Sequence, residues 1–350
     1  MILYVARYHP ALTETFVRDE VRALYAAGVP VELAAFDPRD TVPIEPIGAP
    51  VHMQPHRWGW LPALPGLFVE WARRPALLSP RVLWLAGLLR RSRRAHVHFA
   101  GEAAEWTRLA CGRVGVTYSV TVHAVDIYKP RPGLVEVLRD AQAVVAMTEW
   151  NQRLLAERWG VAAHLVRFGV DVAGTIEAQP ARSSTILSVG RNVPKKGLDL
   201  VVGLAQALGS QAQVRIISDL APSPPAWVLP LCDHAEVRRE IANAGLFVLP
   251  CRQAADGDMD GLPVVLVEAM AAGVPVVTTP ISGIPELVDD EVGWVVPPED
   301  PAALLAAVRE ALANPEERGR RGAAGRRRLL ERGYTVARLV IAMRDILAVQ

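Results

Sequence analysis

Cysteine is scarce in this sequence, and the spacing of the few present excludes several kinds of site. Cys111, Cys232 and Cys251 are odd in number and widely scattered, without any C-x-x-C pair. Zinc ribbons and disulfide frameworks need paired or regularly spaced cysteines. We therefore expect three ordinary thiols in a reducing compartment and no disulfide framework.

A strong net charge and a long apolar run are missing as well. The formal net charge is only +1, while 51% of the residues are hydrophobic. Such a composition excludes a disordered chain and offers no general attraction to nucleic acid. No apolar run approaches the roughly 18 residues that span a bilayer, and the opening MILYVARYHP resembles a short strand rather than a secretory signal. We expect a globular protein in the cytoplasm.

Two phosphate-binding signatures are also missing. Neither G-x-x-x-x-G-K-[ST] nor G-x-G-x-x-G occurs in the chain, so the P-loop and dinucleotide-binding classes lack their central signal. What is present is an alternation of short β-branched runs with helical stretches, which predicts an α/β fold with parallel sheets covered by helices on both faces. The predicted strands lie near residues 2–6, 31–36, 96–99, 117–122, 143–147, 164–167, 185–190, 213–217, 246–249, 274–278 and 293–296.

The pattern weakens between Gly169 and Ser184, where glycine, proline and serine gather. Such a stretch is typical of a linker between two domains. In the first domain, Thr13 is predicted to cap a helix that runs to Ala27, with Gly28 closing it. The last predicted helix, 336–347, has no strand after it.

The stretch from Asp256 to Glu286 carries the densest chemical pattern. Its acidic loop leads into a helix predicted to begin at Pro263 and to stop at Gly273. Asp260 and Glu268 are eight positions apart, so both carboxylates are able to face one ligand. The string D-x-D-x-D-G imitates a calcium loop, but Val267 holds the twelfth position, where that loop needs its bidentate acid. A D-x-D metal clamp and a solvated turn remain as readings of Asp256 to Asp258, and the turn is favoured.

The segment from Gly190 to Gly197, GRNVPKKG, sits between a predicted strand and the next helix. Cations beside exposed helix N–H groups favour a diphosphate, although a solvated basic turn explains the same residues. His123 ends another strand, where an imidazole suits a sugar hydroxyl or a developing charge, or plays a structural part. Glu14 and Thr15 belong to the first strand-to-helix turn, and Glu14 is equally explained as a favourable charge in the first turn of a helix.

Residues 56–94 are rich in tryptophan and arginine, with Trp58, Trp60, Trp71 and Trp84 among eight arginines and a single acid, Glu70. This composition suits an anionic membrane surface. A pair of helices with inward-packed tryptophans is the alternative. A peripheral protein on the inner membrane face is therefore one expectation for this chain.

Taken in order, these motifs resemble the retaining nucleotide-sugar glycosyltransferases of family four, in particular the bacterial exopolysaccharide and colanic-acid type. The resemblance covers nearly the whole chain. It rests on the segments TETF at 13–16, H-x-HF at 96–99, T-x-HA-x-DIY at 121–128, GVD at 169–171, GR and KG at 190–197, and DGLP with EAMA at 260–271.

The resemblance implies the GT-B fold, with two facing Rossmann-like domains and a donor cleft between them. Residues 1–170 would form the acceptor-side domain, 171–184 the linker, and 185–332 the nucleotide-sugar domain. Residues 333–350 would cross back to the first domain. The implied function is retaining, metal-independent transfer of a hexose from a UDP- or GDP-sugar to a saccharide, lipid-linked or glycoconjugate acceptor, without a cofactor or a nucleic-acid partner.

The resemblance also assigns residues. Arg191 and Lys196 would hold the donor diphosphate, with backbone N–H groups of Gly261 and Leu262. Glu268 would bind the ribose and Asp260 the transferred sugar, with His123 beside that sugar. The expected catalytic residues are therefore His123, Asp260 and Glu268, while Glu14, Thr15 and Asp126 are assigned to the acceptor or sugar side.

Two departures from the family pattern matter. The usual E-x7-E appears here as D-x7-E, because Asp260 holds the first position, and its shorter carboxylate reaches about one methylene less. A glycine-rich stretch is replaced by SDLAPSPP at 218–225. These departures leave two alternatives, a weak or inactive nucleotide-sugar binding protein and a sugar-nucleotide 2-epimerase.

Overall fold

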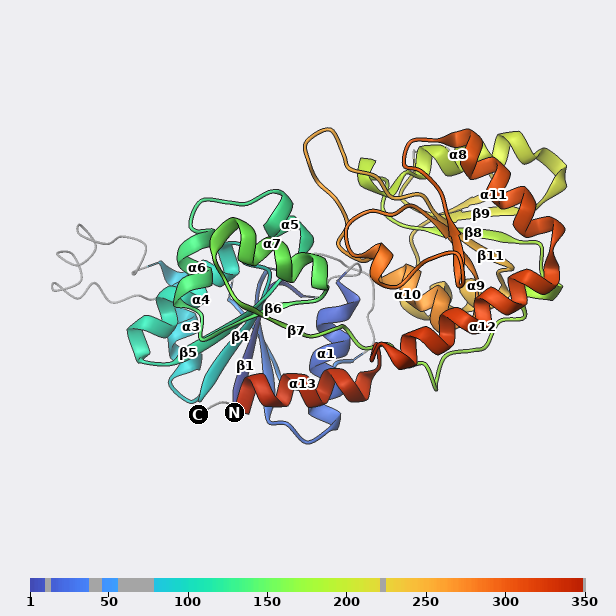
Figure 1. The fold of residues 1–350 in the computed structure, drawn as a ribbon. Helices are drawn as coiled ribbons and strands as arrows, with labels where there is room; N and C mark the ends of the chain where they lie inside the picture. The colour runs from blue at the N-terminus through green and yellow to red at the C-terminus, as the bar shows by residue number, and fades with distance from the viewer. Residues whose placement is uncertain (10–13, 38–45, 56–78, 221–224, 349–350) are drawn as a thin grey trace. The chain divides into compact units, whose positions relative to one another are not determined.

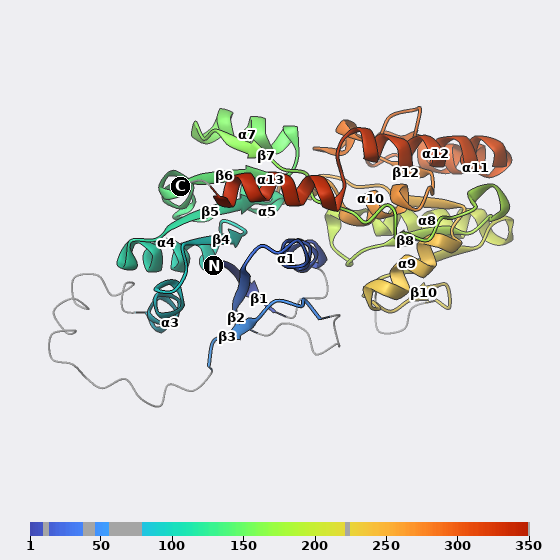
Figure 2. The ribbon, with the colours of Figure 1, turned by 90° about the horizontal axis from the view of Figure 1, so that it is seen from below.

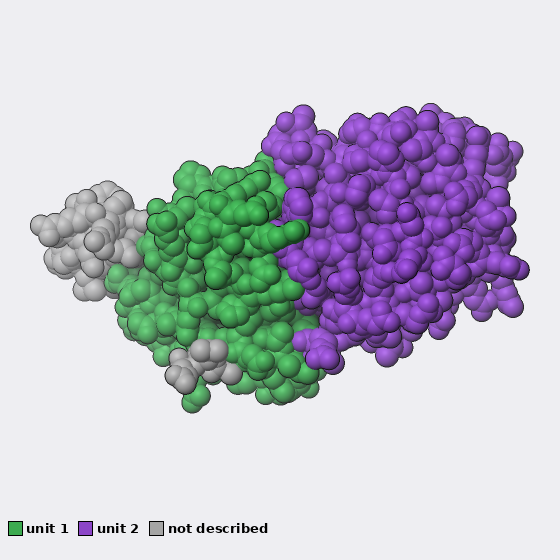
Figure 3. Space-filling model, viewed as in Figure 1, with its two compact units in different colours: residues 1–147, 152–166, 339–350 green, residues 148–151, 167–338 purple. Residues whose placement is uncertain are grey.

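The computed structural model describes residues 1–9, 14–37, 46–55, 79–220 and 225–348. The chain forms two compact units, coloured separately in Figure 3. Unit 1 contains residues 1–147, 152–166 and 339–350, and unit 2 contains residues 148–151 and 167–338. Residues 171–184 therefore pack with unit 2, and most of the last helix packs with unit 1.

Unit 1 is built on a parallel sheet with the strand order β3-β2-β1-β4-β5-β6-β7 (Figure 1). Every neighbouring pair is parallel, as expected when helices connect successive strands. The strands are β1 (Ile2–Tyr8), β2 (Val31–Asp37), β3 (Val51–Met53), β4 (Arg94–His98), β5 (Thr117–Val122), β6 (Ala143–Ala146) and β7 (Ala163–Leu165).

Helices lie on both faces of this sheet (Figure 2), so successive residues of a central strand are buried on opposite sides. Leu3 and Val5 of β1 join the hydrophobic core that also contains Leu85 and Ala104. Tyr4, between them, is fully buried and donates its hydroxyl to Glu20 at 2.8 Å. The helices are α1 (Thr15–Ala26), α3 (Pro80–Leu89), α4 (Glu102–Val114), α5 (Ala124–Tyr128), α6 (Leu134–Asp140), α7 (Glu149–Trp159) and α13 (Val336–Ala348), although residues 149–151 and 336–338 count with unit 2.

Unit 2 is built on a second parallel sheet, with the order β10-β9-β8-β11-β12-β13. Its strands are β8 (Ile186–Val189), β9 (Val214–Ile217), β10 (Val228–Leu229), β11 (Leu246–Leu249), β12 (Val276–Thr278) and β13 (Gly293–Val295). Its helices are α8 (Leu198–Leu208), α9 (His234–Asn243), α10 (Val264–Ala271), α11 (Pro301–Ala313) and α12 (Pro315–Glu331).

Both sheets contain a point where the strand order reverses direction. In unit 1 this point lies between β1 and β4, and in unit 2 it lies between β8 and β11. The loops that leave such a pair at the carboxyl ends diverge to opposite faces of the sheet, which opens a ligand-binding crevice there. The fold therefore directs attention to the loops after β1, β4, β8 and β11.

The predicted α/β fold of two Rossmann-like domains is confirmed, with corrections at the edges. The short edge strands β3 and β10 were not predicted, and the strand predicted at 96–99 ends at His98, because Phe99 has a φ of +66°. Pro263 is the N-cap of α10 rather than its first helical residue. Helix α1 starts at Thr15 with Glu14 as N-cap, so Glu14 is not in the first turn; the predicted cap, Thr13, lies outside the described residues.

The proposed membrane segment is described only from residue 79 onward. Trp84 packs edge-on against Phe36, with ring centroids 5.4 Å apart. Arg94 is buried and donates to the carbonyl oxygen of Ile346 at 2.7 Å. Trp84 is therefore partly buried against the core, as the alternative of inward-packed tryptophans expects, and Arg94 is buried at the start of β4. Among the described residues no helix is both long and apolar enough to cross a membrane.

Candidate functional site

The basic loop after β8 is clamped against the loop after β11. Gly197 has a φ of +64°, and a Cβ at this position would lie 2.1 Å from the carbonyl oxygen of Pro250. The backbone N–H of Arg252 donates to the carbonyl oxygen of Lys195 at 3.0 Å. The Arg252 guanidinium also pairs with Asp199 at the start of α8, at 2.7 and 3.0 Å. Close backbone contact therefore fixes where the two lysines point.

Lys195 and Lys196 face the acidic loop directly. Lys196 Nζ lies 2.7 Å from Asp260 Oδ2. Lys195 Nζ lies 3.1 Å from Asp258 Oδ1 and 3.4 Å from Asp260 Oδ1. We refer to Lys195, Lys196, Asp258 and Asp260 as the lysine–aspartate cluster.

Burial and charge oppose each other in this cluster. Burial alone would raise the pKa of Asp260, but the two lysines more than offset it and hold that pKa below its ordinary value. Burial likewise would lower the pKa of Lys196, but Asp260 raises it above its ordinary value, against a smaller lowering by Arg191. Asp260 and Lys196 thus both keep their charges at neutral pH, and Arg191 adds a further cation near Lys196.

The predicted phosphate-binding backbone lies at the start of α10. Leu262 is buried, and the carbonyl oxygen of Gly261 accepts the N–H of Gly283 at 2.8 Å. Pro263 follows as N-cap and has no side-chain cap hydrogen bond, so its side chain does not satisfy the N–H groups of the first helical turn. An anion there would benefit from the helix dipole.

Glu268, about one turn into α10, has a partner that sequence reasoning missed. Its Oε1 lies 2.6 Å from Nε2 of His234, the first residue of α9. The side chains are 15% and 12% exposed, respectively. The pair is therefore reachable by a ligand while its carboxylate is held in one orientation.

In the acidic segment that resembles a metal site, Asp256 and Asp258 make hydrogen bonds and ion pairs within the protein. Asp256 Oδ1 accepts the N–H of Asp258 at 3.1 Å, which is an Asx turn. Asp258 in turn pairs with Lys195. This arrangement agrees with the solvated-turn reading of Asp256, while Lys195, which the predicted site did not include, proves central to the cluster.

In unit 1 His123 is the N-cap of the short helix α5. Its ring stacks on Phe99 at 4.1 Å between centroids and lies 4.9 Å from Phe16. Asp126 accepts the backbone N–H of His123 at 2.9 Å and is buried. Burial is the main reason that the pKa of Asp126 is raised to about 6. The Asp126 carboxylate thus shapes the turn that presents His123.

Glu14 is the N-cap of α1 and Thr15 is its first residue. Glu14 lines a small hollow together with Tyr8 and His9. The structure thus places these residues at the start of the helix that follows β1.

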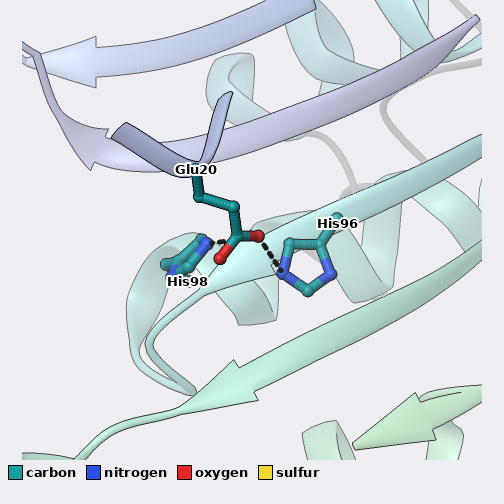
Figure 4. A group of neighbouring side chains, drawn as sticks. All are labelled: Glu20, His96 and His98. Carbon is teal, nitrogen blue, oxygen red and sulfur yellow. Dashed lines mark ion pairs between the residues drawn. The ribbon is translucent and has the colours of Figure 1, made fainter. Parts of the chain in front are cut away.

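A buried cluster behind His123 was also missed. Glu20 of α1 points between His96 and His98 of β4, with its Oε1 3.9 Å and 3.4 Å from their Nε2 atoms (Figure 4). The signal was available as H-x-H on a strand, since alternate residues share a face. Within the described residues this is the group that brings three metal-ligating side chains together. Because His96 already bonds to two hydroxyls, Ser119 at 2.8 Å and Thr121 at 3.0 Å, we interpret the group as a hydrogen-bond network.

Comparison with known proteins identifies both halves of the chain. Residues 13–173 match the Glycosyltransferase Family 4 domain, and residues 183–314 match the domain described as Glycosyl transferases group 1. An amylovoran biosynthesis glycosyltransferase of Erwinia amylovora is 32% identical over 60% of this chain and 59% of its own. A putative colanic acid biosynthesis glycosyltransferase of Escherichia coli is 37% identical over 36% of this chain and 35% of its own. The matches thus span between about a third and three fifths of these relatives.

Solved structures agree on the fold. Sucrose-phosphate synthase from Thermosynechococcus elongatus superposes with a TM-score of 0.76 over 99% of this chain and 98% of its own, at 18% identity. HepE from Anabaena, solved with UDP and glucose, superposes with a TM-score of 0.78 over 100% and 99%, at 15% identity. The chain therefore carries a family 4 and a group 1 glycosyltransferase domain in the GT-B fold, and the predicted resemblance is confirmed.

Proposed function

We propose that this protein is a retaining glycosyltransferase that moves a hexose from a UDP- or GDP-sugar to a saccharide, lipid-linked or glycoconjugate acceptor. The observation that carries the proposal is the lysine–aspartate cluster. Two lysines meet there at the carboxyl edge of β8 and β11, beside the start of α10. The two lysines and Arg191 stand against two aspartates, and the resulting excess of positive charge beside a helix N-terminus suits a diphosphate.

In this proposal each part of the site has one task. Lys196, Arg191 and the N–H groups of Gly261 and Leu262 hold the diphosphate, and Lys195 supplies further charge. Glu268, oriented by His234, accepts the ribose hydroxyls. When the diphosphate binds, Lys196 exchanges part of its contact with Asp260 for the phosphate oxygens. The freed carboxylate of Asp260 then accepts a hydroxyl of the sugar.

Transfer proceeds on one face of the donor sugar. The leaving phosphate helps to deprotonate the acceptor hydroxyl, while the cations and helix N–H groups stabilise the charge that develops on the diphosphate. His123 lies beside the sugar in this proposal, where its imidazole binds a sugar hydroxyl or stabilises the developing charge. Since these cations come from the protein, we propose that no metal is required for the donor.

The test uses purified protein with UDP-glucose, UDP-N-acetylglucosamine, UDP-galactose and GDP-mannose. We expect one of them to raise the melting temperature, because a ligand that binds only the folded state stabilises it. The same donor should be cleaved or transferred in EDTA, with the anomeric configuration retained by NMR. Glu268→Ala should weaken donor binding. If no donor is cleaved or transferred and Glu268→Ala leaves donor binding unchanged, the proposal is wrong.

Binding without turnover would instead support a non-catalytic nucleotide-sugar binding protein, and an epimer formed from donor alone would support an epimerase. Peripheral attachment to the inner membrane face is a separate proposal, motivated by the composition of residues 56–94. Flotation with anionic vesicles tests it, and protein that stays with the unbound fraction would remove it.

A further inference from the structure

A tight turn formed by residues 281–286 follows β12. The N–H of Ile284 donates to the carbonyl oxygen of Ile281 at 3.0 Å, which closes the turn. Ser282 has a φ of +53°, a backbone conformation that is uncommon outside glycine. Such a conformation persists where neighbouring contacts hold it in place. Contacts of this kind are present at both ends of the 281–286 turn.

One end of the turn holds the loop that leads into α10. The N–H of Gly283 donates to the carbonyl oxygen of Gly261 at 2.8 Å. Gly283 has an ordinary φ of −82°, so its backbone conformation does not require glycine, but the space around it does. A Cβ at this position would lie 3.0 Å from the Gly261 carbonyl oxygen and 2.7 Å from Cγ2 of Thr148. Gly261, Gly283 and Thr148 are therefore packed in direct contact.

The other end of the turn holds the first residues of α7. Both carboxylate oxygens of Glu286 accept backbone N–H groups there, from Glu149 at 2.9 Å and from Trp150 at 2.7 Å. The next N–H, that of Asn151, donates to Oγ1 of Thr148 at 3.0 Å. The first N–H groups of a helix have no acceptor within the helix, and a carboxylate is favoured at this end by the helix dipole. Glu286, which is 136 positions from Trp150, therefore completes the start of α7.

Helix α7 continues from this start into the other unit. Residues 148–151 belong to unit 2 and residues 152–166 to unit 1. Leu155 of the same helix is fully buried in the hydrophobic core of unit 1. Energetic coupling is carried by chains of packed and hydrogen-bonded groups of this kind. The contacts thus run without a break from Gly261, through Glu286, to the helix that enters unit 1.

We propose that Glu286 is a positioning residue that couples the diphosphate site to α7. A diphosphate held by the N–H groups of Gly261 and Leu262 stabilises the start of α7, and an intact start of α7 strengthens diphosphate binding. The role of Glu286 at α7 stands on the contacts alone, whereas the identity of the ligand rests on the proposed function. Coupling between two sites is reciprocal, so the two effects are equal in size.

The first experiment follows backbone amide exchange by NMR in the protein without ligand. In Glu286→Ala we expect the amides of Glu149 and Trp150 to exchange about 10- to 100-fold faster than in wild type, because each loses a hydrogen bond to a charged group. The amide of Asn151, which donates to Thr148, should change much less. Glu286→Gln keeps one acceptor oxygen and should restore protection at one of the two amides. Unchanged exchange at both amides in Glu286→Ala would overturn the proposal.

Glu291→Ala is the matched control for Glu286→Ala. Glu291 is also a glutamate of unit 2, but its side chain is 78% exposed and pairs with Arg328 at 2.6 Å. Its removal should leave the exchange of Glu149 and Trp150 unchanged. Equal acceleration in the two variants would mean a general loosening of unit 2 and would refute the specific role of Glu286.

The second experiment adds UDP or GDP to the wild-type protein and so does not depend on the folding of a variant. At saturation we expect one of these nucleotides to slow the exchange of Glu149 and Trp150 about fivefold or more, the lower end of the usual range for coupled sites. The affinity for that nucleotide, measured by calorimetry, should then fall in Glu286→Ala by the same factor. Unequal factors would overturn the coupling, because a purely structural role does not require them to match.

The possible outcomes separate this proposal from the proposed function. If UDP or GDP slows exchange at Gly283 but not at Glu149 and Trp150, the diphosphate site stands and the coupling is wrong. If neither nucleotide slows any amide of unit 2, the diphosphate site is refuted, and the coupling with it, while the first experiment still decides the role of Glu286 at α7. Coupling in a protein that binds the nucleotide but transfers no sugar would refute the proposed function alone.

Discussion

At the edge between β8 and β11 two lysines face two aspartates, whereas at the edge between β1 and β4 one glutamate faces two histidines, with a third behind them. Both groups occupy the point where the strand order reverses. Lysine is a cation across the physiological range, while imidazole changes its charge within it. In the proposed function, the first edge provides the cations for the donor diphosphate, and the second edge presents His123 beside the sugar.

The difference between the two edges is also a difference in how charge is buried. In unit 2 the carboxylate of Asp260 has two cationic neighbours, and its pKa falls below the ordinary value in spite of burial. In unit 1 the carboxylate of Asp126 is held mainly by backbone N–H groups, and burial raises its pKa to about 6. Asp126 and Asp260 should therefore make the stability of the protein depend on pH in opposite directions.

The largest effect is expected from Lys196→Ala. It leaves the buried carboxylate of Asp260 with Lys195, at 3.4 Å, as its remaining lysine neighbour. Removing one partner of a buried ion pair costs about 3–5 kcal/mol of unfolding free energy, which urea unfolding measures. Donor affinity should fall about 10- to 100-fold, because a hydrogen bond to a charged group contributes about 1.5–3 kcal/mol.

The double variant Lys196→Ala with Asp260→Asn separates the two effects. It should recover most of the stability, since no buried charge is left without its partner, but none of the donor affinity. Recovery of affinity together with stability would show that Lys196 acts through the fold and not on the diphosphate.

A smaller effect is expected from Gly197→Ala, with Gly115→Ala in unit 1 as its counterpart. The two glycines have similar left-handed backbones, with φ of +64° and +72°. An alanine at either position costs about 1–2 kcal/mol for the backbone. At position 197 the new Cβ also meets the Pro250 carbonyl oxygen at 2.1 Å, whereas at position 115 nothing lies within 4 Å.

Urea unfolding of the two alanine variants gives the difference directly. Gly197→Ala should be the less stable by about 1 kcal/mol or more, the usual cost of forcing extra atoms into a packed site. Gly197→Ala should also weaken donor binding, because the loop that carries Lys195 and Lys196 has to move. Equal unfolding free energies would show that the loops after β8 and β11 move apart to make room for the new Cβ without a loss of stability.

How far the sequence predicts this molecule differs between its fold and its site. Alternating β-branched and helical runs placed nearly all the strands, because both faces of each sheet are buried. Strands β3 and β10, with three and two residues, are too short to show a period. In the site, Lys196, Asp260 and Glu268 stand in recognisable motifs. Glu20 and His234, in contrast, meet their partners only through the fold. Glu20 lies 76 positions from His96, and His234 lies 34 positions from Glu268.

Unfolding free energy measured against pH tests the opposite pH dependences that we predict for Asp126 and Asp260. The pKa of Asp126 is about 6 in the folded protein, above the ordinary value of 3.8. The folded state therefore binds the proton more tightly, and stability is lost as the pH rises from about 4 to about 6, by about 2–3 kcal/mol. For Asp260 the folded pKa is lowered, so its contribution is present above the unfolded pKa and is lost as the pH falls.

The measurement is urea unfolding of wild type and Asp126→Asn between pH 4 and 7. Asparagine keeps an oxygen for the N–H of His123 and has no charge to bury. Relative to this variant, wild type should become less stable as the pH rises through that window. A difference that does not change with pH would mean that the carboxylate of Asp126 is solvated in the folded protein.

The smallest effect is expected where an imidazole and a carboxylate meet near the surface. His234 and Glu268 form the same chemical pair as His98 and Glu20, yet their side chains are 12% and 15% exposed against 1% and 8%. Solvent therefore replaces much of what His234→Ala removes, and the loss of stability should stay near 1 kcal/mol or less. Affinity for UDP or GDP, measured by calorimetry, should still fall up to about tenfold, equal to about 1.4 kcal/mol, because Glu268 loses the group that orients it. His234→Gln, which keeps an N–H donor, should recover part of that affinity. A loss of stability of about 3 kcal/mol or more, the cost of breaking a fully buried ion pair, would show that the partial exposure of His234 and Glu268 does not weaken their contact.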